Sequence, residues 1–320
     1  MAKYVAPAAL ILAALLPLFV QTWLLTLFSR ALIFASLALG LQIIAGQAGQ
    51  LSLGHAAFFG LGAYTAGLLT RDLGLPFPLA LIAAAAVAGI GGLVMSVSVR
   101  VRGVYFAIAT FAFGIVVNLL FVNLVDVTGG ARGLAGIPAA SLGPLSLESH
   151  ARYYLFVLAV VAAEYLGVVR LTRGRFGRAL RCIGQNELAA RSVGIDITRC
   201  KIQAIVLGSA WAGVAGGLMA QFLRFASPEM FTLLQSIDVV TMLAIGGIAS
   251  PAGAVLGALV MSTLSSYLRA FGTFATVLDG LLIVLAMMYM PGGLVGLVQR
   301  LRQRWTEVSV AKDPSRRTLE

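Results

Sequence analysis

One polar stretch between long apolar runs carries residue types that suit a docking helix. Asn186 is a good helix N-cap, because its short side chain accepts hydrogen bonds from the first free backbone N–H groups. Glu187 suits the positive N-terminal end of a helix, and Gly194 suits the position just past the C-terminal end. The spacing predicts a helix of about two turns over residues 187–193. A helix this short is unstable alone, so we expect it to dock on another surface.

A second group of polar residues lies inside the apolar runs. An ionisable side chain at the bilayer centre costs about 2.5–3.5 kcal/mol on insertion scales, so it is a functional candidate by default. Gln47, Gln50 and Ser52 stand at a glycine-rich break, where they offer hydrogen bonds to a zwitterion. The other candidates for a substrate pathway are His55, Asn118, Glu164 and Asp238.

The ionisable candidates also have structural interpretations. His55 suits packing or hydrogen bonding inside an apolar helix. Glu164 suits an ion pair with a basic residue of a neighbouring subunit, whereas Asp238 and Asp279 suit caps at the membrane interface. The residues themselves leave both interpretations open.

The sequence contains no set of residues for covalent or metal chemistry. It lacks the G-x-x-x-x-G-K-[ST] motif that cradles phosphates, so we expect no ATPase site of its own. The two histidines and two cysteines have no zinc-ligand spacing, and no Ser/His/Asp set is discernible. We therefore expect no enzyme activity, and no metal or cofactor.

The composition indicates a membrane protein. Of 320 residues 60% are apolar and 11% charged, with a mean hydropathy of +0.96, whereas soluble domains are about 25% charged. This excludes a soluble enzyme and a disordered chain. The net charge of +11 does not indicate nucleic-acid binding, because the basic residues are distributed between the apolar runs.

Long stretches without Lys, Arg, Asp or Glu define the membrane segments. A crossing helix needs about 20 apolar residues, and two of the stretches are too long for one helix. Residues 31–70 break at 46–50, and residues 239–268 break at 246–251. We predict an all-α polytopic membrane protein with eight to ten segments, including broken or re-entrant ones. The stretches are 4–29, 31–70, 73–99, 103–125, 202–223, 239–268 and 280–299, with a shorter one at 153–169.

The basic residues predict the orientation. They concentrate in the connection at Arg100 and Arg102, in a loop at about 171–201 and in the tail 300–320, which the positive-inside rule places in the cytoplasm. Both termini are then cytoplasmic, and Arg30 falls in an outer connection. We expect a permease domain over 1–299 and a basic cytoplasmic tail over 300–320 that contacts anionic membrane lipid. The N-terminal run 4–29 is too long for a signal-peptide core, so we expect it to be retained.

The docking helix matches a known motif. Glu187, Ala189, Ala190 and Gly194 fit the pattern E-x-A-A-x-x-x-G, which resembles the EAA loop of ABC importer permeases. In that family the short helix sits in a groove of the cytoplasmic ATPase and transmits its closure to the membrane bundle. The arginine-rich flank, with Arg178 and Arg181, suits an acidic or polar surface on that partner.

Further stretches resemble the LivM-type permease subunits of branched-chain amino acid (HAAT family) ABC importers. They are 46–58 (GQAGQLSLGHAAF), 105–110 (YFAIAT), 128–130 (TGG), 133–134 (GL), 227–228 (SP), 246–247 (GG) and 291–294 (PGGL). The resemblance covers about residues 30–300. It implies a bacterial inner-membrane subunit that works with a second, LivH-like permease, two cytoplasmic ABC ATPase subunits and a periplasmic or extracellular solute-binding protein.

Two alternatives concern the substrate and the energy source. At several positions where family members often carry an acidic or basic residue, this chain has an uncharged one. These residues are Ile115, Ser265, Ser266 and Met290. Urea and short-amide permeases share the architecture, so such a substrate is an alternative. The other is an ion-coupled secondary transporter, with Glu164 and Asp279 as proton or sodium sites, because broken helices also occur in that class.

Overall fold

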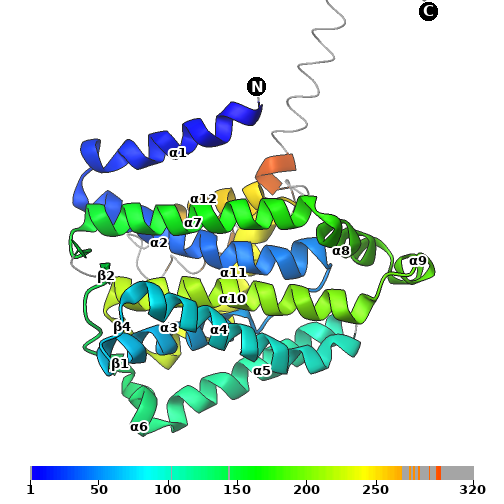
Figure 1. Cartoon of the computed structure of the whole chain (residues 1–320), viewed down its shortest axis with the longest axis horizontal. Helices are drawn as coiled ribbons and strands as arrows, with labels where there is room; N and C mark the ends of the chain where they lie inside the picture. Colours follow the sequence, from blue (N-terminus) through cyan, green and yellow to red (C-terminus); the bar gives the residue numbers. More distant parts are fainter. Residues whose placement is uncertain are drawn as a thin grey trace, which may run out of the picture.

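The computed structural model describes residues 2–101, 103–142 and 145–268, together with 274, 277, 280, 281, 288 and 293–296. In these residues the chain is almost entirely helical (Figure 1). The predictions for Asp279, Arg102 and the tail 300–320 concern residues outside this described part.

The α-helices are α1 (Ala2–Phe19), α2 (Thr22–Leu41), α3 (His55–Arg71), α4 (Phe77–Met95), α5 (Val104–Asn123), α6 (Val125–Thr128), α7 (His150–Arg173), α8 (Arg175–Gln185), α9 (Glu187–Ser192), α10 (Ile197–Leu223), α11 (Leu233–Gly246) and α12 (Pro251–Leu268).

Shorter elements join the helices. A π-helical turn, η1 (Gln42–Gln47), continues α2, and the 3₁₀ turns are η2 (Ser96–Arg100), η3 (Gly130–Arg132) and η4 (Pro228–Phe231). The strands β1 (Leu134–Ala135) and β4 (Phe225–Ala226) pair antiparallel, as do β2 (Ser141–Leu142) and β3 (Leu145–Ser146). These two-residue pairs only tie loops together.

The apolar runs form helices of membrane-spanning length. In the described part of the chain six helices are long and apolar enough to cross a bilayer, and α11 is a shorter apolar helix. A helix satisfies all its internal backbone groups, which is why such runs fold this way in lipid. The prediction of an all-α polytopic membrane protein is confirmed.

The centre of the bundle is α10, which packs against α2, α3 and α4. Glycines make this possible, because helices in lipid associate through close backbone contact rather than through a hydrophobic force. A side chain at Gly62 of α3 would collide with the backbone of Gly213, and one at Gly216 with the carbonyl of Phe59. The many glycines of the sequence therefore contribute mainly to helix packing.

The first predicted break lies where η1 ends. Residues 48–54 are non-helical, and α3 begins at His55, next to Leu37 of α2 rather than at the end of the bundle. The segment thus returns among the helices before α3 begins. Non-helical backbone at such a depth requires surrounding protein, and here α5 supplies it, since Leu53 N–H donates to Thr110 Oγ1 at 3.0 Å.

The second predicted break separates α11 from α12. The two helices pack antiparallel through glycines, with Gly246 against Gly253 and Gly257 against Met242. Residues 247–250 form the turn between them. Because Gly46 lies against the Ile248 carbonyl, this turn is next to η1. The two breaks are therefore neighbours in space.

Figure 1 shows the bundle with two different ends. α8 and α9 project from one end, while α6, β1, β2 and β4 lie at the other. The basic side chains are unequally divided. Toward the α8–α9 end lie Arg100, Arg170, Arg173, Arg175, Arg178, Arg181, Arg191, Arg199 and Lys201, and toward the other end lie Arg71, Arg132, Arg152 and Arg224.

The prediction for Arg30 is wrong. The first helix ends at Phe19, and α2 runs unbroken through Arg30, which therefore lies within a helix and not in a connection. Its guanidinium lies 5.6 Å from the ring centroid of Phe34, a cation–π contact. It also lines a cavity of about 580 Å³ with the polar side chains of Gln235 and Ser266.

Candidate docking and translocation sites

The predicted docking helix is present as α9, with the expected caps. The Asn186 side chain accepts hydrogen bonds from the backbone N–H groups of Leu188 and Ala189, at 3.0 and 3.1 Å. The chain leaves the helix through Gly194, whose φ of +80° is strained for residues with a side chain. The helix ends at Ser192, one residue before the predicted end. Local sequence thus fixes both ends of α9.

An ion pair between a buried lysine and a partly exposed glutamate anchors α9 to α10. The Nζ of Lys201 lies 2.5 Å from Oε1 of Glu187, and the Lys201 side chain is 2% exposed. Beneath α9, Ala190 packs in a small apolar cluster with Ile183 of α8 and Ile197 of α10. In the sequence, Lys201 is only one of the basic residues of the loop at about 171–201 that indicate the orientation in the membrane. No local pattern pairs it with a carboxylate 14 residues away.

The outer face of α9 is exposed and partly apolar. Leu188 is 70% exposed and Val193 73% exposed, and Ala189, Arg191 and the Gly194 turn also face solvent. Large apolar side chains at the tip of a projecting knob, beside an arginine, are typical of a protein contact.

Arg178 and Arg181 attach α8 to the end of α7. Nη1 of Arg178 donates to the carbonyl of Arg173 at 3.1 Å, and Nη1 of Arg181 donates to the carbonyl of Thr172 at 2.8 Å. These carbonyls belong to the last turn of α7, which has no helical partners for them. Both arginines therefore cap α7, a role that the charge pattern alone does not reveal.

α8 also rests directly on the first break. A side chain at Gly49 would lie 3.1 Å from Cα of Gly184, so the two backbones are in contact. Nη1 of Arg181 also lies 3.4 Å from Oε1 of Gln47. On its other side Gln47 donates from Nε2 to the carbonyl of Ala249 at 3.2 Å. The Gln47 amide therefore lies between α8 and the second break.

A cavity of about 210 Å³ lies deeper, between the starts of α3 and α11 and the middle of α5. Its lining is mostly apolar, and Asn118 lines it while donating to the Pro228 carbonyl at 2.7 Å. Ser236 Oγ accepts from the Ala56 N–H at 3.0 Å and joins the two helix starts. The cavity is lined by Leu53, Gly54, Ala56, Ala57, Phe111, Gly114, Ile115, Asn118, Leu119, Phe231, Thr232, Leu233 and Ser236.

Three other candidates lie in the first break or at the first residue of α3, close to this cavity but not in its lining. His55 is fully buried, with Nε2 3.2 Å from the Leu37 carbonyl. Gln50 and Ser52 are buried, and their side-chain polar atoms have no hydrogen-bond partner among the described residues.

Glu164 and Asp238 lie on different helices, and neither lines this cavity. Glu164 is buried in α7 next to Ser36 of α2, although its carboxyl oxygens have no well-formed hydrogen bond to a described residue. Asp238 is exposed on α11. The seven pathway candidates therefore do not form one site.

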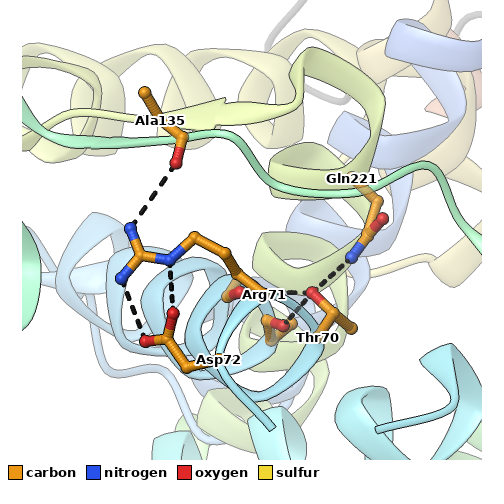
Figure 2. Close-up of polar contacts among 7 residues, drawn as sticks. Thr70, Arg71, Asp72, Ala135 and Gln221 are labelled. Carbon is orange, nitrogen blue, oxygen red and sulfur yellow. Dashed lines mark hydrogen bonds and ion pairs between the residues drawn. The ribbon is translucent and has the colours of Figure 1, made fainter. Parts of the chain in front are cut away.

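The end of the bundle opposite α9 is held by a polar cluster (Figure 2). Arg71 pairs with Asp72 at 2.6 Å and reaches the Ala135 carbonyl at 3.5 Å, while Gln221 of α10 donates to Thr70 at 2.8 Å. The Arg71 guanidinium holds the pKa of Asp72 below its ordinary value by hydrogen bonding to the carboxylate. These contacts join the ends of α3 and α10 to β1.

The chain is similar to characterised transport proteins over nearly its whole length. Residues 23–290 match the family model described as branched-chain amino acid transport system / permease component. The chain is 32% identical to the Escherichia coli high-affinity branched-chain amino acid transport system permease protein LivM, over 91% of this chain and 74% of LivM. It is 25% identical to LivH of Salmonella typhimurium, over 82% of this chain and 91% of LivH. No solved structure matches the chain significantly.

The helical membrane fold and these similarities define the chain as a multi-pass permease subunit of a transport system. More specifically, it belongs to the family of branched-chain amino acid transport system permease components.

Proposed function

We propose that this chain is one of two membrane subunits of an importer that brings branched-chain or related hydrophobic amino acids into the cell. ATP hydrolysis on two separate cytoplasmic subunits drives the transport. A second, LivH-like permease completes the membrane part, and an external binding protein delivers the solute. Similarity to both LivM and LivH over most of the chain supports this assignment.

The observation that carries the proposal is α9 itself. A six-residue helix with both ends capped, fixed to α10 by an ion pair, presents exposed Leu188 and Val193 away from the bundle. Such a knob suits a groove on an ATPase. Closure of the ATPases would push α9, and α8 would pass the movement to the helix breaks.

The charge distribution supports an orientation in which α8 and α9 face the cytoplasm of the inner membrane. The basic residues concentrate at that end, as the positive-inside rule requires. Residues 1–299 then form the permease domain and 300–320 the cytoplasmic tail. The cluster around Arg71 and Asp72 faces outward, on the side of the binding protein.

The cavity between α3, α5 and α11 suits part of the substrate pathway. Two helix N-termini border it, and helix N-termini favour negative groups such as a carboxylate. Phe111, Ile115 and Phe231 supply apolar surface for a branched side chain. Gln50, Ser52 and His55 of the first break lie close to this path, whereas we assign Glu164 and Asp238 no direct contact with substrate.

Reconstitution of the complete transporter tests the proposal. The chain is placed in liposomes with the partner permease, both ATPases and the binding protein, and uptake of labelled leucine, isoleucine and urea is measured with and without ATP. We expect ATP-dependent uptake of the branched-chain amino acids. Uptake of urea alone would contradict the substrate class, and uptake driven by an ion gradient without ATPases would contradict the energy source.

A further inference from the structure

The Gln47 side chain touches both the coupling loop and the second helix break. Its Oε1 lies 3.4 Å from Nη1 of Arg181 on α8, and its Nε2 donates to the carbonyl of Ala249 at 3.2 Å. Gln47 is 3% exposed, and it is the last residue of η1 at the first break. Three segments that are far apart in the sequence therefore meet at one amide group.

We propose that Gln47 is a positioning residue that makes α8 and the two helix breaks move as one unit, rather than a substrate-binding residue. The proposal rests on the proposed function, because it concerns how movement of α9 reaches the membrane interior. The sequence alone makes Gln47 a candidate for the substrate pathway, but Gln47 does not line the cavity between α3, α5 and α11.

The chemistry of a primary amide suits this position. A glutamine side chain accepts through its oxygen and donates through its nitrogen, so it can bind an arginine and a carbonyl at the same time. Gln42 also donates to the Ala249 carbonyl, at 3.4 Å. Gln42 links the two breaks to each other, whereas Gln47 also links them to α8.

Backbone contact reinforces the link. The Gly184 backbone lies against Gly49, and a side chain at Gly184 would lie 2.9 Å from the carbonyl oxygen of Gln47. Gly46 lies against the Ile248 carbonyl. When α8 moves toward η1, it therefore meets backbone without an intervening flexible side chain.

Two substitutions each remove one half of the link. Gln47→Glu keeps an acceptor for Arg181 but places a carboxylate against the Ala249 carbonyl. Gln47→Lys keeps a donor for Ala249 but repels Arg181. In liposomes containing the full complex, we expect each to lower uptake per ATP hydrolysed by about tenfold, within the range typical of coupling between sites. ATPase co-purification is expected to remain.

A double variant restores both contacts. Gln47→Lys combined with Arg181→Glu gives an ion pair with α8 and a donor for Ala249. Because Arg181→Glu also removes the hydrogen bond to the Thr172 carbonyl, the double variant is compared with Arg181→Glu alone, and we expect its uptake per ATP to be at least about threefold higher than that of this single variant. Gln203→Glu and Gln203→Lys are matched controls, because Gln203 is an exposed glutamine in the first half of α10. We expect the controls to keep the original ratio.

A distance measurement does not depend on how these variants fold. Spin labels are attached to Cys182 of α8 and to Ile248→Cys, in a chain with Cys200→Ser in the full complex. Cys182 is exposed and Ile248 is 46% exposed, so both accept a label. We expect the distance between the labels to stay the same with and without ATP. A change in that distance, or uptake per ATP equal to the original in both Gln47 variants, would overturn the proposal.

The failure of this proposal differs from failure of the proposed function. If the original complex shows no ATP-driven uptake, the proposed function is wrong. If it transports normally and the Gln47 variants transport equally well per ATP, then only the role of Gln47 is wrong.

Discussion

Lys201 is a buried cation whose described partner is the carboxylate of Glu187. Removing one member of a fully buried ion pair costs about 3–5 kcal/mol, because the other charge stays buried without compensation. The Glu187 side chain is 22% exposed, so the cost here falls below that range, although Lys201 would still be left buried without a partner carboxylate. We therefore expect Glu187→Ala to lower the melting temperature of the purified complex, detach α9 from α10 and reduce ATP-driven uptake. Thermal unfolding in detergent and uptake in liposomes measure the two effects.

The double variant Glu187→Ala with Lys201→Met tests whether the stability lost in Glu187→Ala comes from the buried charge that is left without a partner. Methionine fills similar volume without a charge, so we expect most of the lost stability to return. If Glu187→Ala leaves the melting temperature unchanged, the ion pair does not anchor α9.

Gly194 provides a second test at the residue scale. Its φ of +80° costs residues with a side chain about 1–2 kcal/mol, although asparagine adopts this region more readily. A side chain at Gly194 would meet no atom within 4 Å, so any effect comes from the backbone. We expect Gly194→Val to weaken ATPase co-purification and uptake, and Gly194→Asn to have little effect. Equal results for both variants would show that the turn does not depend on this conformation.

At the scale of elements, the glycine contacts of α10 determine how the bundle packs. A side chain at Gly216 would collide with the Phe59 carbonyl of α3, whereas one at Gly89 would make ordinary contacts of 3.7 Å. We expect Gly216→Ala to lower the melting temperature strongly, since the backbones must separate. Gly89→Ala is the control and is expected to leave it almost unchanged. A strong effect of the control alone would contradict this packing.

Elements defined by local sequence are predictable, and the contacts between them are not. Asn186 and Gly194 predict α9 because caps act within a few residues, and glycine-rich stretches predict both breaks. The pairing of Arg181 with Gln47, 134 residues apart, depends on packing of the whole bundle. Arg30 was misplaced because a charge within an apolar run indicates a connection unless tertiary contacts accommodate it.

The whole molecule separates two tasks between its ends. Among the described residues, the α8–α9 end carries most of the basic side chains and the proposed docking helix, whereas the other end holds the cluster around Arg71 and Asp72. Between them lie the two breaks and the cavity at the starts of α3 and α11. On the proposed function, a push at α9 would reach the non-helical backbone beside the cavity through α8.

This arrangement predicts which side of the membrane each end faces. In a chain with both native cysteines replaced by serine, we expect Val193→Cys to react with a membrane-impermeant thiol reagent only from the cytoplasmic side. Asp72→Cys is expected to react only from outside. The chain is labelled in the absence of its ATPase subunits, which would cover Val193. Both residues are exposed in the chain itself, so the membrane determines which side the reagent reaches them from. Reaction of both cysteines from one side would contradict the orientation.

The central claim, that α9 is the knob gripped by an ATPase, is tested most directly by photo-crosslinking in the assembled transporter. A photoreactive amino acid replaces the exposed Leu188, and a matched one replaces Asp72 at the opposite end. We predict that the group at position 188 links to the ATPase subunit and that the group at position 72 does not. A group at 188 that links to the external binding protein, or to no ATPase in an actively transporting complex, would contradict the account.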